Sequence, residues 1–305
     1  MTQTVWVTGA AGFTGRFMIE TLRAHPDELR IVGLDVTVPD EHSADEYFAL
    51  DLCEPEALKR PIQDAPPDVV IHLAGLMPPW SEAEMRRVNV DGSLALANAL
   101  LSAGMSAVRI ISAGSAAEYS NLGTGPITED TDLGNGGPYG LTKIEQSTRL
   151  LQLAANSGLS VIIARSFNLL GPGLSRNLVA GALCEQFMTN GRKGYIRPKG
   201  PIDSVRDFID VRDVTRAYWL LAKKGVAAEA YNVCTGVGTE ISRVINILSK
   251  EFDMTVRIEP DFDPAVVQSN TSIGDNSKLL ALGWQPRISL EESLHCMVRA
   301  VRGEV

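Results

Sequence analysis

Hydrophobic positions in the first half of the chain fall into short apolar runs, separated by longer stretches with apolar residues at helical spacing. This alternation is typical of a parallel sheet with crossover helices, so we expect an α/β fold of the doubly wound Rossmann type. The expected buried strands are Thr4–Thr8, Arg30–Leu34, Asp68–Leu73, Val108–Ser112 and Val161–Arg165. The expected helices are Phe13–Ala24, Glu54–Gln63, Ser81–Ala103 and Pro138–Ser157.

The pattern loosens after about residue 166, where glycine and proline interrupt shorter elements. We therefore expect residues 1–166 to form the Rossmann domain, and residues 167–202 and 236–305 to form a smaller α/β lobe for substrate. Residues 203–235 are expected to return to the first domain, because Arg206–Ala222 resembles a compact helix and Tyr231–Val233 a strand.

The composition is that of a chain able to bury a large core. Of its 305 residues 45% are hydrophobic, and the formal net charge is -9 with no dense run of lysine and arginine. Binding to nucleic acid or to anionic membranes is therefore not expected. The first residues lack the basic flank and long apolar run of a signal peptide, and no stretch approaches about 18 consecutive apolar residues. We expect a cytoplasmic protein.

The cysteines offer neither a disulfide framework nor a metal site. They lie far apart in sequence and form no Cys-x-x-Cys pair. Disulfide scaffolding and a thiolate zinc cluster are therefore both disfavoured, and we expect free thiols and no metal ion. The four residues are Cys53, Cys184, Cys234 and Cys296.

A glycine-rich turn joins the first expected strand to the first expected helix. It reads Gly9-Ala10-Ala11-Gly12-Phe13-Thr14-Gly15. Such a turn lets the backbone approach a pyrophosphate, whose charge the N-terminus of the helix stabilises. A packed strand-to-helix turn can use the same glycines without a ligand, so the turn alone does not establish a dinucleotide site.

The next strand ends in Asp35, about 20 residues beyond Gly15, where a carboxylate can accept hydrogen bonds from the adenosine ribose. Asp35 would also repel a ribose 2′-phosphate, and the following Val36-Thr37-Val38 offers no cation. The sequence therefore favours NAD over NADP. Further candidate cofactor contacts at the ends of later strands are Asp51, Leu52, Leu73, Ala74 and Gly75. The neighbouring His72 is interpreted as a strand-end residue.

Tyr139 and Lys143 are four residues apart, so both lie on one face of an expected helix. An adjacent ammonium stabilises a phenolate, so we expect Lys143 to lower the pKa of Tyr139 toward the working range of a general acid or base. Ser115 adds a hydroxyl just beyond the strand that ends at Ser112. Each signal is common by chance, but together they predict a catalytic group of Ser115, Tyr139 and Lys143.

Over nearly its whole length the chain resembles the extended short-chain dehydrogenases/reductases of the nucleotide-sugar epimerase/dehydratase/reductase group. The motifs that carry the resemblance are Gly9-x-x-Gly12-x-x-Gly15, Asp35, His72-Leu-Ala-Gly75, Asn89, Ser115, Tyr139-x-x-x-Lys143, Arg165-x-Phe167-Asn168-x-x-Gly171-Pro172 and Arg206-Asp207-Phe208-x-Asp210-Val211. It implies that Tyr139 exchanges a proton with a sugar hydroxyl or carbonyl, that Lys143 binds the nicotinamide ribose, and that Ser115 orients the substrate oxygen. It also implies a cofactor contact from Asn89 and substrate contacts from Asn168 and Arg206.

The residues after Ser115 narrow the reaction. Sugar 4,6-dehydratases of this family carry an acidic residue one or two positions after the catalytic hydroxyl, where this chain has Ala116 and Ala117. Dehydration is therefore disfavoured. Glu118 would point to the other face if the strand continued, and is interpreted as structural.

The motifs are most similar to those of the GDP-4-keto-6-deoxy-D-mannose reductases. This implies hydride transfer from NAD(P)H to the C4 ketone of a nucleotide sugar, with Tyr139 protonating its oxygen. An NAD-dependent nucleotide-sugar epimerase remains an alternative, as does a dehydrogenase or epimerase of a non-nucleotide sugar or polyol. A non-catalytic dinucleotide-binding protein is disfavoured because the catalytic group is intact.

One position departs from the family pattern. Family members usually clamp the substrate diphosphate with an arginine of the small lobe, and the aligned position here is Asp263. A carboxylate would repel the same phosphate. Arg206 remains, and other cations that can compensate are Arg176, Arg192 and Lys199.

The resemblance also implies a homodimer, formed through the two long helices expected at Ser81–Ala103 and Pro138–Ser157. Apolar positions on them fit such an interface, and fit packing on the sheet equally well. These positions are Leu94, Ala95, Ala97, Leu150 and Leu151.

Overall fold

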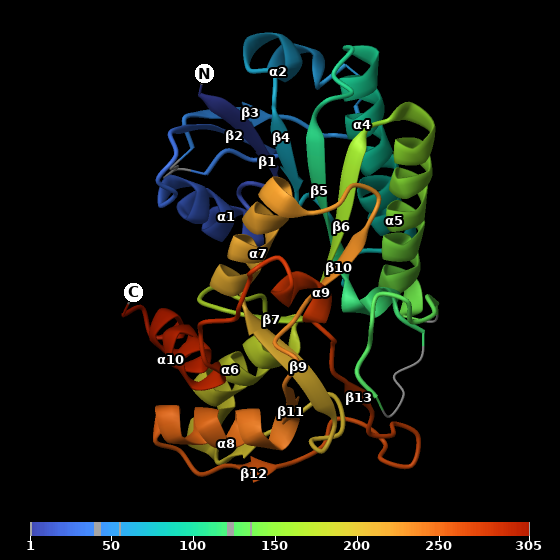
Figure 1. The fold of residues 1–305 in the computed structure, drawn as a ribbon. Coiled ribbons are helices and arrows are strands. Elements are labelled where there is room, and N and C mark those ends of the chain that lie inside the picture. The colour runs from blue at the N-terminus through green and yellow to red at the C-terminus, as the bar shows by residue number, and fades with distance from the viewer. Residues whose placement is uncertain (1, 40–43, 55, 121–124, 135, 305) are drawn as a thin grey trace.

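The computed structural model describes residues 2–39, 44–54, 56–120, 125–134 and 136–304. Within these residues a seven-stranded parallel sheet runs in the order β10-β6-β5-β4-β1-β2-β3 (Figure 1). Its strands are β1 (Gln3–Thr8), β2 (Leu29–Asp35), β3 (Glu46–Ala49), β4 (Val69–His72), β5 (Arg109–Ser115), β6 (Ser160–Ser166) and β10 (Ala230–Val233). The order reverses between β1 and β4, which is the switch point where doubly wound sheets bind ligands. The expected Rossmann architecture is confirmed.

Helices cover both faces of this sheet, so the strands are apolar on both sides (Figure 1). α1 (Phe13–Arg23) and α7 (Val211–Lys224) pack on the face that carries Val5 and Val7. α4 (Ser93–Ser102) and α5 (Gly137–Ser157) pack on the opposite face, against Trp6. Alternate residues of each strand therefore enter different cores, which explains the continuous apolar runs in the sequence.

The helix expected at Ser81–Ala103 is divided. α3 (Glu82–Arg86) begins at Ser81, whose side chain and that of Glu84 form a capping box, and a π-helical segment (Arg87–Gly92) joins it to α4. α2 (Lys59–Asp64) begins later than the expected Glu54–Gln63, a range whose residue 55 lies outside the described residues. The short edge strand β3 was not predicted.

The helix expected over Arg206–Ala222 is wrong in its first part. Val205–Asp210 is strand β9, and α7 begins only at Val211 because the Asp210 carboxylate accepts a hydrogen bond of 2.8 Å from the Arg212 N–H. β9 pairs with three strands of a second sheet, β7 (Asn168–Leu170), β11 (Gly238–Glu240) and β13 (Thr271–Ser272).

A second core lies on the far side of β9, between α6 (Val179–Asn190), α8 (Ile241–Phe252) and α10 (Leu290–Val301) (Figure 1). Phe187 stacks on Phe252 there, with ring centroids 5.4 Å apart. A two-stranded ribbon of β8 (Tyr195–Ile196) and β12 (Arg257–Ile258) borders this core.

The expected boundaries between the two units stay a prediction. Leu279, on α9 (Ser277–Leu280), and Trp284 fall inside the range 236–305 but pack in the core of the large sheet. No helix among the described residues has the length and apolar character needed to cross a bilayer.

The corner between β9 and α7 gives a prediction about stability. Asp210 is fully buried, caps α7, pairs with Arg212 and accepts a hydrogen bond of 2.6 Å from Ser293 on α10. Asp210→Ala should lower the free energy of unfolding by roughly 2–4 kcal/mol, measured by urea denaturation. The substitution removes the N-cap of α7 and leaves buried donors without an acceptor. Asp64→Ala, which removes the exposed pair with Arg60, is the control and should change it by less than about 0.5 kcal/mol. Equal effects would contradict this role of Asp210.

Candidate active site at the carboxyl edge of the sheet

Ser115, Tyr139 and Lys143 lie together where α5 packs on the end of β5. Ser115 is the last residue of β5, and its hydroxyl lies close enough to the Tyr139 phenol to lower the pKa of that phenol. The Lys143 ammonium donates a hydrogen bond of 2.6 Å to the carbonyl oxygen of Ala113, two residues before Ser115. A Cβ on Gly140 would collide with the carbonyl oxygen of Ala117, so glycine is required for this close approach.

Burial governs the protonation of the two ionisable groups. It raises the pKa of Tyr139 to about 12, while the nearby Ser115 hydroxyl acts in the opposite direction. The expected lowering of the Tyr139 pKa is therefore not found. Burial also lowers the pKa of Lys143 to about 8, against the nearby Glu118 carboxylate, which raises it. At neutral pH the phenol is protonated and the ammonium mostly so, which suits Tyr139 to donate a proton.

Glu118 lies beneath Ser115 and is fully buried. The chain does not continue as a strand here, because Ala116–Glu118 forms a single 3-10 turn. The Glu118 carboxylate accepts hydrogen bonds from the Ser115 N–H, at 2.8 Å, and from Arg165 Nε, at 2.9 Å. These contacts hold the end of β5 against β6.

The glycine turn is packed tightly enough to require its glycines. Gly9 has φ +67°, and a Cβ there would lie 2.8 Å from the Ala74 nitrogen. A Cβ on Gly15 would collide with the Gly9 carbonyl oxygen. Gly12 is the N-cap of α1 and no side chain caps that helix, whose first turn contains Phe13 and Thr14. The N–H groups at the start of α1 are therefore open to an anion.

Asp35 joins the end of β2 to this turn. Its carboxylate accepts hydrogen bonds from the N–H groups of Ala11, at 3.0 Å, and Thr37, at 3.3 Å. It is partly exposed, and so remains accessible to a ribose.

Asp51 lies after β3 and is already engaged within the chain. It accepts hydrogen bonds of 2.9 Å from the Cys53 N–H and from Arg87. Burial acts to raise the pKa of Asp51, but these two partners together lower it below its usual value. The adjacent Leu52 is buried.

The loop after β4 is held from both sides. The N–H groups of Leu73 and Ala74 each donate a hydrogen bond of 3.1 Å to the Thr8 hydroxyl. Asn89 is fully buried. Its amide oxygen accepts a hydrogen bond of 2.7 Å from the Leu76 N–H, and its amide nitrogen donates one of 2.9 Å to the Leu76 carbonyl oxygen. A Cβ on Gly75 would approach the Asn89 oxygen to 3.0 Å. Asn89 therefore fixes the loop, and its contact with a cofactor stays a prediction.

The expected substrate residues lie on the second sheet. Asn168, on β7, donates a hydrogen bond of 3.0 Å to the Asp207 carbonyl. Arg206, on β9, is half-buried and donates only to the carbonyl oxygens of Val205 and Asn270, at 2.9 and 3.0 Å. Burial lowers the pKa of Arg206, and no carboxylate of the described chain pairs with it. It is therefore a cation available to an anionic ligand.

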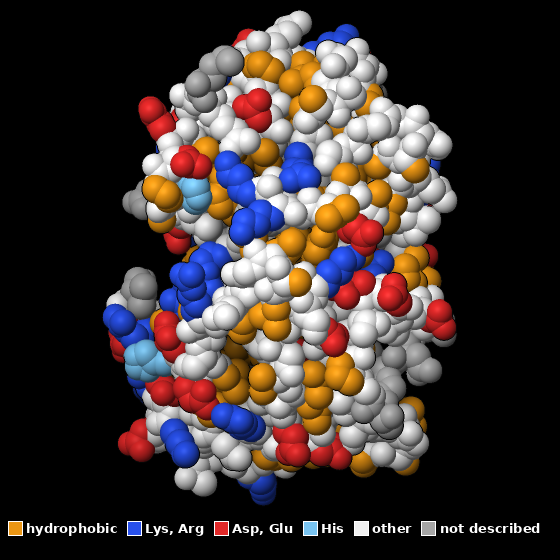
Figure 2. All heavy atoms as spheres, viewed as in Figure 1, with side chains coloured by type: hydrophobic (Ala, Val, Ile, Leu, Met, Phe, Trp, Pro, Cys, Tyr) orange, Lys and Arg blue, Asp and Glu red, His pale blue; other side chains and the backbone are white. Residues whose placement is uncertain are grey.

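Asp263 is exposed and accepts a hydrogen bond of 2.9 Å from the Ala265 N–H, so it closes its own turn. Among the other cations considered, Arg176 pairs with Glu185 on the surface, and Arg192 and Lys199 are exposed. Figure 2 shows further basic side chains over α7, but Arg212 and Arg216 there pair with Asp210 and Asp213.

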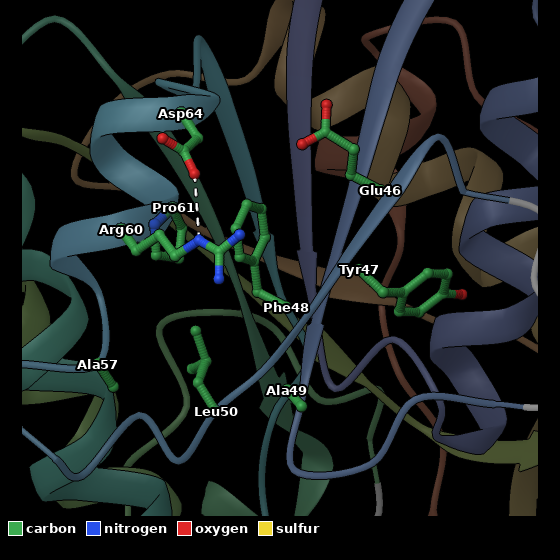
Figure 3. Close-up of a pocket in the computed structure, with 9 residues that line it drawn as sticks. All are labelled: Glu46, Tyr47, Phe48, Ala49, Leu50, Ala57, Arg60, Pro61 and Asp64. Carbon is green, nitrogen blue, oxygen red and sulfur yellow. Dashed lines mark hydrogen bonds and ion pairs between the residues drawn. The ribbon is translucent and has the colours of Figure 1, made fainter.

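A surface depression of about 430 Å³ lies elsewhere, at the edge strand β3 (Figure 3). Arg60 borders it, bonded to Asp64 at 3.2 Å and lying 5.8 Å from the centre of the Phe48 ring. The lining residues are Glu46, Tyr47, Phe48, Ala49, Leu50, Ala57, Arg60, Pro61 and Asp64. None of the residues expected to bind cofactor or substrate is among them.

One hydrogen-bond partner of Lys143 was missed at the sequence level. Gln146, one turn after Lys143 on α5, accepts a hydrogen bond from the Lys143 ammonium through its side-chain oxygen. It is buried, at 1% exposure. Lys143 and Gln146 are three residues apart, so the helical spacing in the sequence already placed the two side chains next to each other.

Known proteins place the chain in a family. The model of the NAD dependent epimerase/dehydratase family matches residues 5–234. GDP-6-deoxy-D-mannose reductase of Pseudomonas aeruginosa is 31% identical, over 98% of this chain and 97% of that protein. UDP-glucose 4-epimerase of Bacillus subtilis is 29% identical, over 86% and 80%. The solved structure of RMD from Pseudomonas aeruginosa, complexed with NADPH, has a TM-score of 0.86 at 29% identity and covers 100% of this chain and 99% of that one. The chain belongs to the NAD-dependent epimerase/dehydratase family.

Proposed function

We propose that this protein is an NAD(P)-dependent reductase that transfers hydride to the C4 ketone of a 4-keto-6-deoxy nucleotide sugar. The observation that carries this proposal is the placement of Tyr139 on α5 close to Ser115 at the end of β5, with Lys143 buried one turn further along the helix. Ala116 and Ala117 supply no carboxylate for dehydration. The named activity of the Pseudomonas aeruginosa relative supports the same reaction.

The arrangement suits reduction step by step. The Ser115 and Tyr139 hydroxyls hold the ketone oxygen, and Tyr139 gives up its proton as C4 receives the hydride, so the carbonyl becomes a secondary alcohol. Bound NAD(P)H supplies that hydride. The nearby ammonium of Lys143 stabilises the phenolate that remains, until solvent returns a proton.

The glycine turn and the uncapped start of α1 fit the pyrophosphate of a dinucleotide. Asp35 supports NAD as the preferred form, although the solved relative is complexed with NADPH. The proposed cofactor contacts are Gly9, Gly12, Phe13, Thr14, Gly15, Asp35, Asp51, Leu52, Leu73, Ala74, Gly75, Asn89, Tyr139 and Lys143.

Substrate would lie between this edge and the second sheet, with Ser115, Asn168 and Arg206 as contacts. Arg206 supports a nucleotide diphosphate, because it is a half-buried cation without a carboxylate partner in the described chain. Asp263 does not neutralise it, since that carboxylate is bonded in its own turn.

An epimerase is the second candidate, and the similarity to a UDP-glucose 4-epimerase favours it. In that reaction the Tyr139 phenolate must first accept a proton from the sugar hydroxyl. A pKa of about 12 leaves little phenolate at neutral pH in the protein without ligands, so this step is unfavourable. Purified epimerase would retain its dinucleotide and consume no NADH, whereas a reductase oxidises NADH in proportion to the ketone supplied.

We also propose a homodimer in the cytoplasm. Of the apolar positions considered on α4 and α5, Ala97 and Leu150 are buried in the core against the sheet. Leu94, Ala95 and Leu151 are partly exposed, as is Leu141 at 50%. These exposed apolar side chains support an interface between the helices of two copies. Sedimentation velocity of the purified protein, which reports its oligomeric state, would test it. The four cysteines are free, as in a reducing compartment.

Tyr139→Phe tests the acid role. It should lower turnover of a GDP-4-keto-6-deoxyhexose with NADH by 10² to 10⁴, because the phenol is the proton donor. The measurement is the NADH absorbance at saturating substrate. Tyr195→Phe, in the ribbon of the smaller core, is the control and should leave turnover within about twofold of wild type. Turnover of Tyr139→Phe within about tenfold of wild type would exclude the proposed role.

Asp35→Ser tests the cofactor preference. The wild-type protein should bind NADH more tightly than NADPH, and the variant should lower that ratio roughly 10- to 100-fold, because charge-assisted bonds to the ribose are lost. Fluorescence titration gives both dissociation constants. Asp27→Ser, at an exposed turn, should leave the ratio unchanged. A wild-type preference for NADPH would overturn the assignment of NAD and leave the reaction class intact.

Arg206→Gln tests the class of substrate. If Arg206 binds the diphosphate, KM for the nucleotide sugar should rise roughly 10- to 100-fold with a smaller change in kcat. Arg243→Gln, an exposed arginine on α8 paired with Glu291, should leave KM unchanged. An unchanged KM in Arg206→Gln would point to a sugar or polyol without the nucleotide.

A further inference from the structure

A row of buried polar side chains crosses the otherwise apolar layer between the sheet and helices α4 and α5. Three of its members lie at one register on neighbouring strands, since Thr8 and Ser112 are both Cα partners of His72. Each follows a core residue by two positions on the same face, as Thr8 follows Trp6. The full row is Thr8, His72, Ser93, Ser112, Gln146 and Lys143, none more than 5% exposed.

The hydrogen bonds of this row converge on Ser93 from both sides. The Ser93 hydroxyl donates its single proton to the Asn89 carbonyl oxygen, 2.5 Å away. The Ser93 oxygen must therefore accept from its two other partners, the Gln146 amide nitrogen at 2.9 Å and His72 Nε2 at 2.7 Å. This places the ring proton of His72 on Nε2.

His72 is consequently a neutral ring with an acceptor at Nδ1. Its Nδ1 accepts from the Thr8 hydroxyl at 2.7 Å, and the Thr8 oxygen accepts from the N–H groups of Leu73 and Ala74. Burial, with a smaller contribution from Lys143, lowers the pKa of His72 to about 3 and keeps the ring neutral. A second ring proton would leave the Thr8 hydroxyl without its acceptor.

The same logic fixes the amide of Gln146. Its nitrogen donates to Ser93 and, at 3.3 Å, to Ser112, so its oxygen faces the Lys143 ammonium. A flipped amide would set N–H donors against that ammonium. Lys143 uses two of its three N–H donors on Gln146 and the Ala113 carbonyl. One donor is left for a ligand, and Gln146 sets its direction.

We propose that Gln146 is a positioning residue, which aims the free N–H of Lys143 into the cofactor site and is itself held by Ser93, His72 and Thr8. The inference rests on the proposed function only in taking Lys143 as a contact of the nicotinamide ribose. At its other end the row reaches the backbone N–H groups of Leu73 and Ala74, which donate to Thr8. A continuous chain of hydrogen bonds therefore joins Lys143 to the loop that lies beside Gly9.

The other groups that face Lys143 define how its charge responds to pH. The 3-10 turn after β5 supplies the Glu118 carboxylate, which is paired with Arg165 on β6. β4 supplies His72, which is neutral, and α5 supplies the uncharged amide of Gln146. Since Lys143 has a pKa of about 8, the lysine loses its charge as the pH rises through that value.

The experiment measures NADH affinity, by fluorescence titration of the whole protein between about pH 6.5 and 10, in wild type and two variants. Wild-type affinity should fall as the pH rises past the midpoint set by Lys143. Gln146→Glu adds a carboxylate beside the ammonium and should move the midpoint up by roughly one pH unit. Gln146→Met keeps the volume without the acceptor, so it should move the midpoint down and weaken NADH binding roughly tenfold at pH 7.

Controls separate positioning from general damage. Gln152 is exposed on the same helix and its side chain makes no hydrogen bond within the described residues, so Gln152→Glu and Gln152→Met should keep the wild-type midpoint. Ser93→Ala removes the link between His72 and Gln146 without altering α5, and should shift the midpoint down by less than Gln146→Met. It provides the test if a Gln146 variant fails to fold, which thermal denaturation reports.

Opposite shifts in the two Gln146 variants support the proposal. Equal losses of affinity at an unchanged midpoint would overturn it, because a merely structural amide predicts that result. NADH affinity independent of pH in every protein, with reductase turnover present, would also overturn it while the proposed function stands. Opposite shifts in a protein that reduces no keto sugar would instead contradict the proposed function and leave the role of Gln146 in place.

Discussion

The candidate site depends on one close contact, between the start of α5 and the carbonyl oxygen of Ala117. A Cβ at Gly136 or Gly140 would collide with that oxygen, so only glycine lets the helix approach the end of β5. Tyr139 lies between these glycines, and Lys143 follows one turn later. The contact therefore sets both the approach of Tyr139 to Ser115 and the bond from Lys143 to the Ala113 carbonyl.

Burial that results from this contact raises the pKa of the Tyr139 phenol. An ammonium beside a phenol was expected to make Tyr139 acidic, but removal of water from the phenol raises its pKa instead. The ammonium is committed to Ala113 and Gln146, as the hydrogen bonds of Lys143 show. A phenol that keeps its proton donates to a developing alkoxide, which is the need of a ketone reductase.

The sequence predicted the features that depend on residues close together along the chain. Five strands and the glycine turn follow from apolar runs and turn residues, whereas the order of the strands is seen only in the structure. Arg206–Asp210 was mistaken for helix because Asp210 acts as a cap only once the chain has turned there. The pKa of Tyr139 depends on packing between α5 and β5, which no motif records. Gln146 is joined to His72 through Ser93, and those three residues lie far apart along the chain.

The polar row of the large sheet and Arg206 of the second sheet differ in how far their polar groups are satisfied within the protein. On the large sheet the side chains from Thr8 to Gln146 are joined by hydrogen bonds to one another and to Lys143, which keeps one N–H for a ligand. On the second sheet Arg206 is half-buried with carbonyl partners alone. An unpaired guanidinium in that position costs stability unless an anion completes it. The edge proposed to bind the cofactor is thus preorganised, while the edge proposed to bind substrate keeps a charge that a phosphate can satisfy.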